Sequence, residues 1–164
     1  MATEVVLDAC TIITLDGCGA LDVILLIEGY DFYLGPIVEG ECRPGCGTAL
    51  DGHIAAKRLT RVPVADVPAT LFLDLLQRYR LGDGETECLT VCGGLDYLIA
   101  TDDMAARRAA TELYGAEKLT GSVGLLRIAV TRGLLTPSAA MGYYNRGRRA
   151  GAFLPDIGED YFRP

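Results

Sequence analysis

The fold of this chain is decided by the stretch Asp96-Tyr-Leu-Ile-Ala100-Thr101-Asp102-Asp103. Its first part, from Asp96 to Ala100, is short and apolar, as expected of a buried strand, and the polar triplet Thr101-Asp102-Asp103 closes it. The segment from Met104 to Tyr114 then shows the apolar spacing of a helix. A buried strand that passes directly into a helix is typical of a parallel sheet.

The same alternation extends in both directions from this stretch. The N-terminal run Glu4-Val-Val-Leu-Asp8 is a second short strand that ends in an acid, and a helical stretch follows it. Further strands are expected at Asp31–Leu34, Arg61–Val64 and Glu117–Thr120. Further helices are expected at Ala20–Ile27, from Pro36 through Glu41, at Thr48–Leu59, Pro68–Leu81, Val123–Arg132 and Pro137–Arg148, and after the break at Gly82-Asp-Gly84, with a turn at Arg43–Gly47.

This order of elements predicts an α/β fold, in which a parallel sheet is covered by helices on both faces. Ligands of such sheets bind beyond the carboxyl ends of the strands, at the point where the strand order reverses. Asp8 and Asp102 each follow a strand, so both carboxylates are expected to open into that crevice.

The length and composition indicate one soluble globular domain. With 164 residues, of which 50% are hydrophobic, the chain is expected to form a single domain over residues 1–164. The N-terminus lacks the basic region and the long apolar region of a signal peptide, and no stretch approaches the length of a membrane span. A cytoplasmic location without membrane association follows, and there the six cysteines are expected to be reduced thiols.

The equal spacing of Cys42 with Cys46 and of Cys88 with Cys92 would allow a four-thiolate zinc site. Structural zinc sites favour shorter turns of the Cys-x2-Cys type. In addition, Cys88 and Cys92 fall in an apolar helical pattern, where cysteine packs as a small hydrophobic residue. These arguments disfavour zinc.

The charge distribution predicts one basic flank. The net charge of −7 argues against a protein whose whole surface attracts nucleic acid. From Leu119 to Pro155, however, the sequence contains no acidic residue. The arginines within that segment are Arg127, Arg132, Arg146, Arg148 and Arg149.

Acidic residues occur at loci that should share one end of the sheet. Such carboxylates repel one another unless a cation neutralises them, and oxygen ligands suit Mg²⁺ or Mn²⁺. For any single acid, a helix cap or a solvated surface position is the more common role. The loci are Asp8, the pair Glu39 and Glu41, the pair Glu85 and Glu87, and the pair Asp102 and Asp103.

In these motifs the chain resembles the PIN domains, and especially the VapC-like toxin and stand-alone subgroup. Val5-Val-Leu-Asp8-Ala-Cys-Thr11 is similar to their opening strand, and Pro36-Ile-Val-Glu39-Gly-Glu41 to their second motif. The segment Leu81–Glu87, with its Gly-x-Gly-Glu pattern, and the segment Leu98–Arg107 resemble the third and fourth motifs. Gly121–Leu126 and Arg132–Leu135 resemble the closing segment, so the resemblance runs from Val5 to about Phe162.

The resemblance implies a three-layer sandwich and metal-dependent cleavage of RNA phosphodiester bonds by a Mg²⁺- or Mn²⁺-dependent endoribonuclease. It also implies the toxin half of a toxin–antitoxin pair, hence an antitoxin partner, and a homodimer. The direct metal ligands are then Asp8 and Asp102, completed by Glu41, or Glu39 in its place, by Glu85 and by Asp103. Glu87 and Asp103 orient groups around the ligands, and Thr11 or Thr101 positions water or phosphate.

Basic and aromatic residues supply candidate RNA contacts. Arg107, at the start of a helix after Asp102, reaches a phosphate or is an ordinary solvated charge. The cluster Arg146, Arg148 and Arg149 is expected to hold phosphates on either side of the cut. The adjacent pair Tyr143-Tyr144 stacks on unpaired bases or covers the core.

Other classes fit the sequence less well. His53 is the only histidine, which excludes acid–base catalysis by a histidine pair. An aspartyl phosphatase needs Asp-x-Asp after its first strand, whereas Ala9 and Cys10 follow Asp8 here. A receiver domain places its acid pair after the first strand, not near Asp102. The strongest alternative is a catalytically silent PIN-like module that binds RNA or a protein partner.

Overall fold

A computed structural model describes residues 1–163. The strands are β1 (Thr3–Leu7), β2 (Tyr30–Leu34), β3 (Thr60–Arg61), β4 (Leu98–Ala100) and β5 (Leu119–Thr120). The helices are α1 (Ala9–Cys18), α2 (Leu21–Ile24), α3 (Pro36–Ala55), α4 (Ala69–Tyr79), α5 (Asp83–Leu95), α6 (Met104–Tyr114), α7 (Ser122–Thr131) and α8 (Pro137–Arg149). Short 3-10 helices are η1 (Val64–Asp66), η2 (Ala116–Lys118) and η3 (Glu159–Phe162).

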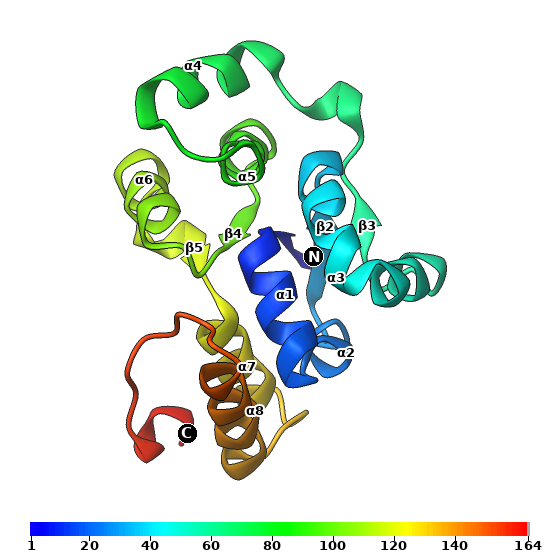
Figure 1. Cartoon of the computed structure of the whole chain (residues 1–164), viewed down its shortest axis with the longest axis vertical. Coiled ribbons are helices and arrows are strands. Elements are labelled where there is room, and N and C mark those ends of the chain that lie inside the picture. Colours follow the sequence, from blue (N-terminus) through cyan, green and yellow to red (C-terminus); the bar gives the residue numbers. More distant parts are fainter. Residues whose placement is uncertain (164) are drawn as a thin grey trace.

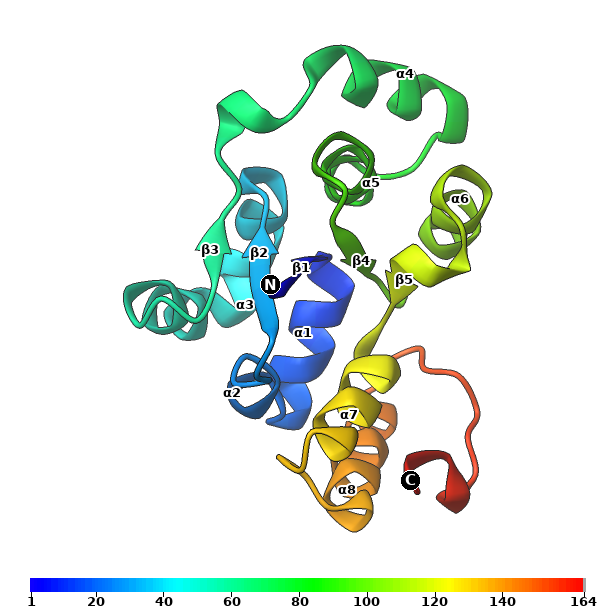
Figure 2. The same cartoon turned by 180° about the vertical axis from the view of Figure 1, so that it is seen from behind.

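The five strands form one parallel sheet in the order β3-β2-β1-β4-β5. The helices α5 and α6 cover one of its faces, and α1 and α2, with α7 and α8 beside them, cover the other (Figure 1; Figure 2 from behind). The α/β fold with a three-layer arrangement is thereby confirmed.

The central strand β1 fixes where a ligand can bind. The chain moves from β1 to β2 and β3 on one side and then returns to β4 and β5 on the other, so the strand order reverses between β1 and β4. Val5, Val6 and Leu7 of β1 are fully buried, as a central strand covered on both faces requires. In the β1–β4 register Leu7 pairs with Ala100, which sets the next residues, Asp8 and Thr101, side by side.

The helix boundaries follow from local chemistry. Asp8 caps α1 by accepting a hydrogen bond from the Ala9 N–H, and Gly19 ends α1 in the left-handed conformation with φ of 82°. Asp103 caps α6 by accepting from the Ala106 N–H, and Thr136 caps α8 by accepting from the Ala139 N–H. Within residues 1–163, no helix is both long enough and apolar enough to cross a membrane.

Several expected elements differ from the structure. The strand expected at Arg61–Val64 is reduced to β3, with η1 beginning at Val64, and the strand expected at Glu117–Thr120 begins only at Leu119, after η2. The predicted turn at Arg43–Gly47 is wrong, because α3 continues through it and is only kinked at Cys46, whose φ is −133°. Pro44 removes one backbone donor inside α3, and the Cys46 thiol donates to the Cys42 carbonyl at 3.2 Å, so the helix bends without ending. The predicted helix at Ala20–Ile27 shortens to the single turn of α2.

The N-terminus of α3 is capped from another helix. Pro36 occupies its first position and has no N–H to satisfy. The next two amides, of Ile37 and Val38, donate to the two carboxylate oxygens of Glu87 on α5 at 3.1 and 3.0 Å. Glu87 is 2% exposed and lies against Gly35, where an added Cβ would stand 2.1 Å from the Glu87 carboxylate. Glu87 therefore joins α5 to the start of α3.

Replacing Glu87 by Ala should lower the free energy of unfolding by about 2 kcal/mol, because two buried N–H groups lose their acceptor. Glu87→Gln retains one acceptor oxygen and should lose less. Urea denaturation of the purified variants measures both, and equal stability of Glu87→Ala and the natural protein would contradict the capping role.

Candidate metal centre

The centre of the site is a hydrogen-bonded pair at the ends of β1 and β4. The Thr101 hydroxyl donates to Asp8 Oδ2 at 2.6 Å, and Asp8 Oδ1 accepts from the Ala9 amide at 2.8 Å. Asp8 is 2% exposed and Thr101 is fully buried. The carboxylate of Asp8 is thus held in one orientation, although each oxygen retains lone pairs.

Asp102 is oriented in a similar way from the start of α7. Its Oδ1 accepts from the Ser122 amide at 2.8 Å, and its Oδ2 accepts from the Ser122 hydroxyl. An added Cβ at Gly121 would stand 2.6 Å from Asp102 Oδ1, so only glycine fits there. Burial raises the pKa of Asp102, while the Ser122 hydrogen bonds and the positive charge of Arg107 act to lower it.

A second pair of carboxylates approaches from α3 and α5. Glu41 Oε1 accepts from the Gly84 amide at 3.2 Å, and Glu85 Oε2 accepts from the Gly82 amide at 2.6 Å. Burial raises the pKa of Glu85 above its ordinary value, and the negative charges of Asp8, Asp103 and Glu41 raise it further. Acids that are distant in sequence therefore act on one another through their charges.

Glu85 and Asp102 line a pocket of about 300 Å³, whereas Asp8 and Glu41 are not part of its lining. Asp103 lies at its edge, where Oδ1 is engaged as the cap of α6. The residues that line the pocket are Cys10, Thr14, Glu85, Asp102, Asp103, Met104 and Phe153.

Cys10 and Ser122 belong to the site but were not predicted from the sequence. The Cys10 thiol donates to Asp8 Oδ2 at 3.2 Å, and its sulfur accepts from the Asp102 amide at 3.3 Å. Burial, followed by the charge of Asp8, raises the pKa of Cys10 to about 12. Cys10 is two residues from the predicted ligand Asp8 in the sequence. Ser122 is brought to the predicted ligand Asp102 only by the fold. The sequence therefore carried a signal for Cys10 alone.

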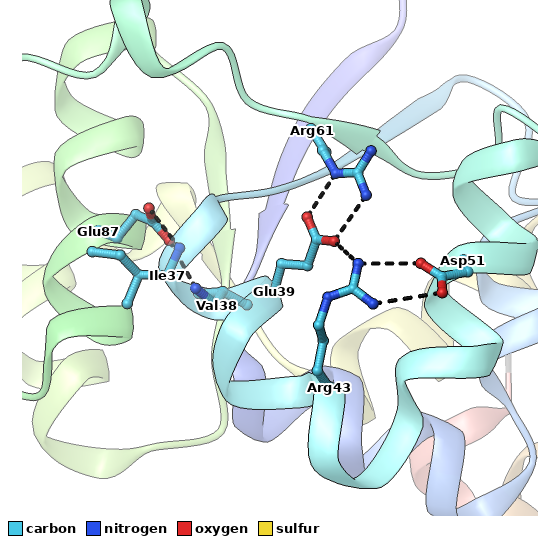
Figure 3. Close-up of polar contacts among 7 residues, drawn as sticks. All are labelled: Ile37, Val38, Glu39, Arg43, Asp51, Arg61 and Glu87. Atoms are coloured by element: carbon cyan, nitrogen blue, oxygen red, sulfur yellow. Dashed lines mark hydrogen bonds and ion pairs between the residues drawn. The ribbon is translucent and has the colours of Figure 1, made fainter.

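Glu39 forms ion pairs with two arginines and does not line the pocket. Arg61 donates to both Glu39 oxygens at 2.7 and 2.9 Å, and Arg43, which also pairs with Asp51, contacts the same carboxylate (Figure 3). These arginine contacts, with the Arg61 hydrogen bond first, lower the pKa of Glu39 to about 2 although burial opposes them. Of the two glutamates of this motif, Glu41 alone has a carboxylate directed at α5.

Two further predicted site residues lie outside the pocket lining. Glu87 uses both carboxylate oxygens to cap α3, as Figure 3 shows. Thr11 is fully buried, and within residues 1–163 its hydroxyl has no hydrogen-bond partner. Of the two threonines expected to position water or phosphate, only Thr101 has a hydroxyl that contacts Asp8 within the described residues.

The donor set fits Mg²⁺ or Mn²⁺ better than a thiophilic ion. Within the described part of the chain, no three His, Cys, Asp or Glu side chains converge closely enough to form a metal cage. Mg²⁺ keeps several of its waters and needs only one or two protein carboxylates, so this set of carboxylates suits it without forming a closed cage. Burial raises the pKa of Cys42, Cys46, Cys88 and Cys92, as expected of thiols packed in a core.

The arginines predicted to bind RNA are partly engaged inside the protein. Arg107 donates to the carbonyls of Thr101 and Thr120 at 2.7 and 2.9 Å, which ties α6 to both strand ends. Arg146 donates to the Cys18 carbonyl, and Arg148 pairs with Asp156.

The remaining predicted contacts have other positions. Arg149 is exposed. Tyr144 is 3% exposed and packs in the core, which leaves no face for stacking. His53 is buried in α3, with its Nε2 3.2 Å from Asp22.

The family model described as a PIN domain matches residues 4–155. The chain belongs to the PIN-domain family. No curated protein matches the chain significantly. PIN domains are commonly nucleases that use divalent metal ions, in agreement with an acidic pocket at the switch point of the sheet.

In this PIN domain, Glu39→Gln should lower the free energy of unfolding by about 1 to 3 kcal/mol at neutral pH. Because the pKa of Glu39 is depressed from 4.5 to about 2, its stabilisation is present above pH 4.5 and is lost as the pH falls toward 2. Urea titrations at several pH values should show the difference shrinking with acid. The exposed Glu28→Gln is the control, and a difference independent of pH would contradict the ion-pair explanation.

Gly84→Ala should displace the Glu41 carboxylate, because the added Cβ would stand 2.3 Å from Glu41 Oε2. We expect Mg²⁺ affinity, measured by calorimetry, to fall by about tenfold or more with the fold preserved. Gly40→Ala on α3, where a Cβ would meet nothing within 4 Å, is the matched control. Unchanged affinity in Gly84→Ala would place Glu41 outside the site.

Proposed function

We propose that this protein is a Mg²⁺- or Mn²⁺-dependent endoribonuclease that hydrolyses RNA phosphodiester bonds. The observation that carries the proposal is that Asp8 and Asp102 follow the neighbouring strands β1 and β4 at the sheet's switch point, each oriented by a hydroxyl of the protein. Glu41 on α3 and Glu85 on α5 supply two further carboxylates, and the charges of Asp8 and Glu41 act on Glu85.

The bound ion would lower the pKa of a water and neutralise charge on the leaving oxygen. Asp8 and Asp102 would hold it, since Thr101 and Ser122 fix their carboxylates before any ligand arrives. Glu85 lines the pocket with a raised pKa, which suits a group that takes a proton from the attacking water. Asp103, also in the lining, would orient that water through its second oxygen.

Asp102→Asn tests the ligand role. Cleavage of an unstructured RNA should fall by about a hundredfold or more, because a ligand is lost. The melting temperature should stay equal or rise, because a buried charge with a raised pKa is removed. Asp8→Asn should show the same loss of cleavage.

Asp83→Asn is the control for this test, because Asp83 is an exposed acid at the start of α5, close in sequence to Glu85. Full activity of purified, folded Asp102→Asn would contradict the proposal.

The alternative of a catalytically silent module rests on a specific observation. Both oxygens of Asp8 and both oxygens of Asp102 already accept hydrogen bonds from the protein. Calorimetry with MgCl₂ and MnCl₂ separates the two functions: metal binding that Asp102→Asn abolishes supports the enzyme. RNA binding without any metal binding supports the silent module.

We further propose that the ribonuclease is the toxin of a toxin–antitoxin pair, acting in the cytoplasm and as a homodimer. Its pocket is lined by Glu85, Asp102 and Asp103, so a small antitoxin is suited to block it by inserting an Arg or Lys side chain.

Expression of the gene alone in a bacterial host should arrest growth and degrade RNA, and the Asp102→Asn gene should do neither. Growth curves and RNA gels from matched protein levels measure this. Normal growth with intact RNA at a high level of active protein would exclude the toxin role and leave the nuclease proposal standing.

A further inference from the structure

A single exposed phenylalanine stands at the mouth of the carboxylate pocket. Phe153 is 80% exposed and lines that pocket together with Glu85 and Asp102. It also lines a neighbouring pocket of about 560 Å³, which includes Arg107 and Thr120. Phe153, Met104 and Asp102 are common to both linings, so the ring lies on the border between the two hollows.

The backbone around Phe153 is fixed on both sides. The Ala152 amide donates to the Gly147 carbonyl of α8 at 3.0 Å, and the Leu154 amide donates to the Ala152 carbonyl at 3.1 Å, which closes a tight turn with Phe153 at its tip. Leu154 is 9% exposed and packs against Gly147.

The chain after Phe153 is held as firmly. The Tyr144 hydroxyl donates to the Pro155 carbonyl at 2.8 Å, and Arg148 pairs with Asp156. This segment leaves α8 and passes beside α7 (Figures 1 and 2). The exposed ring is therefore presented by an ordered turn.

We propose that Phe153 stacks on the unpaired base next to the phosphodiester held in the carboxylate pocket, and so determines where the RNA is cut. This inference rests on the proposed ribonuclease function. Base–aromatic stacking is a main source of binding energy for single-stranded nucleic acid, and an aromatic ring serves any base because every base has a π-face.

The surroundings of the ring favour a base over a protein surface. Its sequence neighbour Leu154 is buried, and the hollow beside the ring holds the polar groups of Arg107, Thr120 and Asp156 together with a second aromatic residue, Tyr161. A base is flat, apolar on its faces and polar at its edges, which matches a ring bordered by hydrogen-bonding groups. Because a base is joined to its phosphate through one sugar, a ring beside the carboxylates is placed to contact the nucleotide being cut.

Phe153→Trp tests the stacking directly, because the chain contains no tryptophan and the new indole is the only one. An unstructured single-stranded RNA, added in Mg²⁺ buffer, should quench its fluorescence at mixing, before any cleavage. The same sequence annealed into a duplex should quench it much less. Leu73→Trp, on α4 and 59% exposed, is the matched control and should not respond.

Quenching restricted to Phe153→Trp and to single-stranded RNA supports the proposal, whether or not the RNA is later cut. No quenching at RNA concentrations that bind the protein overturns it. Quenching by a co-expressed protein partner and not by RNA likewise overturns it, because the ring would then be a protein-docking residue.

A cleavage assay supplies the second readout. In Phe153→Ala the KM for RNA should rise by about tenfold or more, with the melting temperature unchanged and cut sites redistributed. Phe153→Tyr should keep the natural KM and cut sites, and Phe153→Leu should resemble Phe153→Ala. A Phe153→Leu variant equal to the natural protein would show apolar contact without stacking. Absence of cleavage by the natural protein would count against the ribonuclease function. The fluorescence experiment would still test whether Phe153 stacks on RNA bases.

Discussion

The site depends on the register between β1 and β4. Because Leu7 pairs with Ala100, Asp8 and Thr101 leave the sheet side by side, and the Thr101 hydroxyl reaches Asp8 at 2.6 Å. A slip of one residue would turn every side chain of β1 to the opposite face and remove its apolar side chains from the core. The same packing that buries Val5, Val6 and Leu7 therefore also sets the position of the first carboxylate.

Carboxylates with similar places in the sequence have different physical roles. Glu39 and Glu41 are separated by one glycine, yet Glu39 is paired with Arg43 and Arg61 whereas Glu41 faces α5. Glu85 and Glu87 divide in the same way, since Glu85 lines the pocket and Glu87 caps α3. Residues two positions apart on a helix point to nearly opposite sides, so the packing of α3 against α5 decides which arginine, amide or pocket each acid meets.

The sequence predicted the parallel sheet, its order of strands and helices, and Asp8 and Asp102 at the strand ends, because buried strands and their closing acids are local signals. It mispredicted α3, since Pro44 and two nearby glycines resemble a turn whereas tertiary packing keeps the helix continuous through a kink. It also missed Ser122, whose contact with Asp102 spans a separation of 20 residues. Contacts of this kind are created by the topology and have no local signature.

The topology also has a consequence for when the site assembles during synthesis. The strand pair that builds the site joins residues 93 positions apart, at Asp8 and Thr101. Asp102 is then oriented only by Ser122, at the start of α7. When β1 to β3 have left the ribosome, Asp8 and Glu41 are already exposed. Their contacts Thr101 and Gly84 have not yet emerged. The pocket cannot assemble until α7 has emerged, so a nascent chain passes most of its synthesis without a complete site.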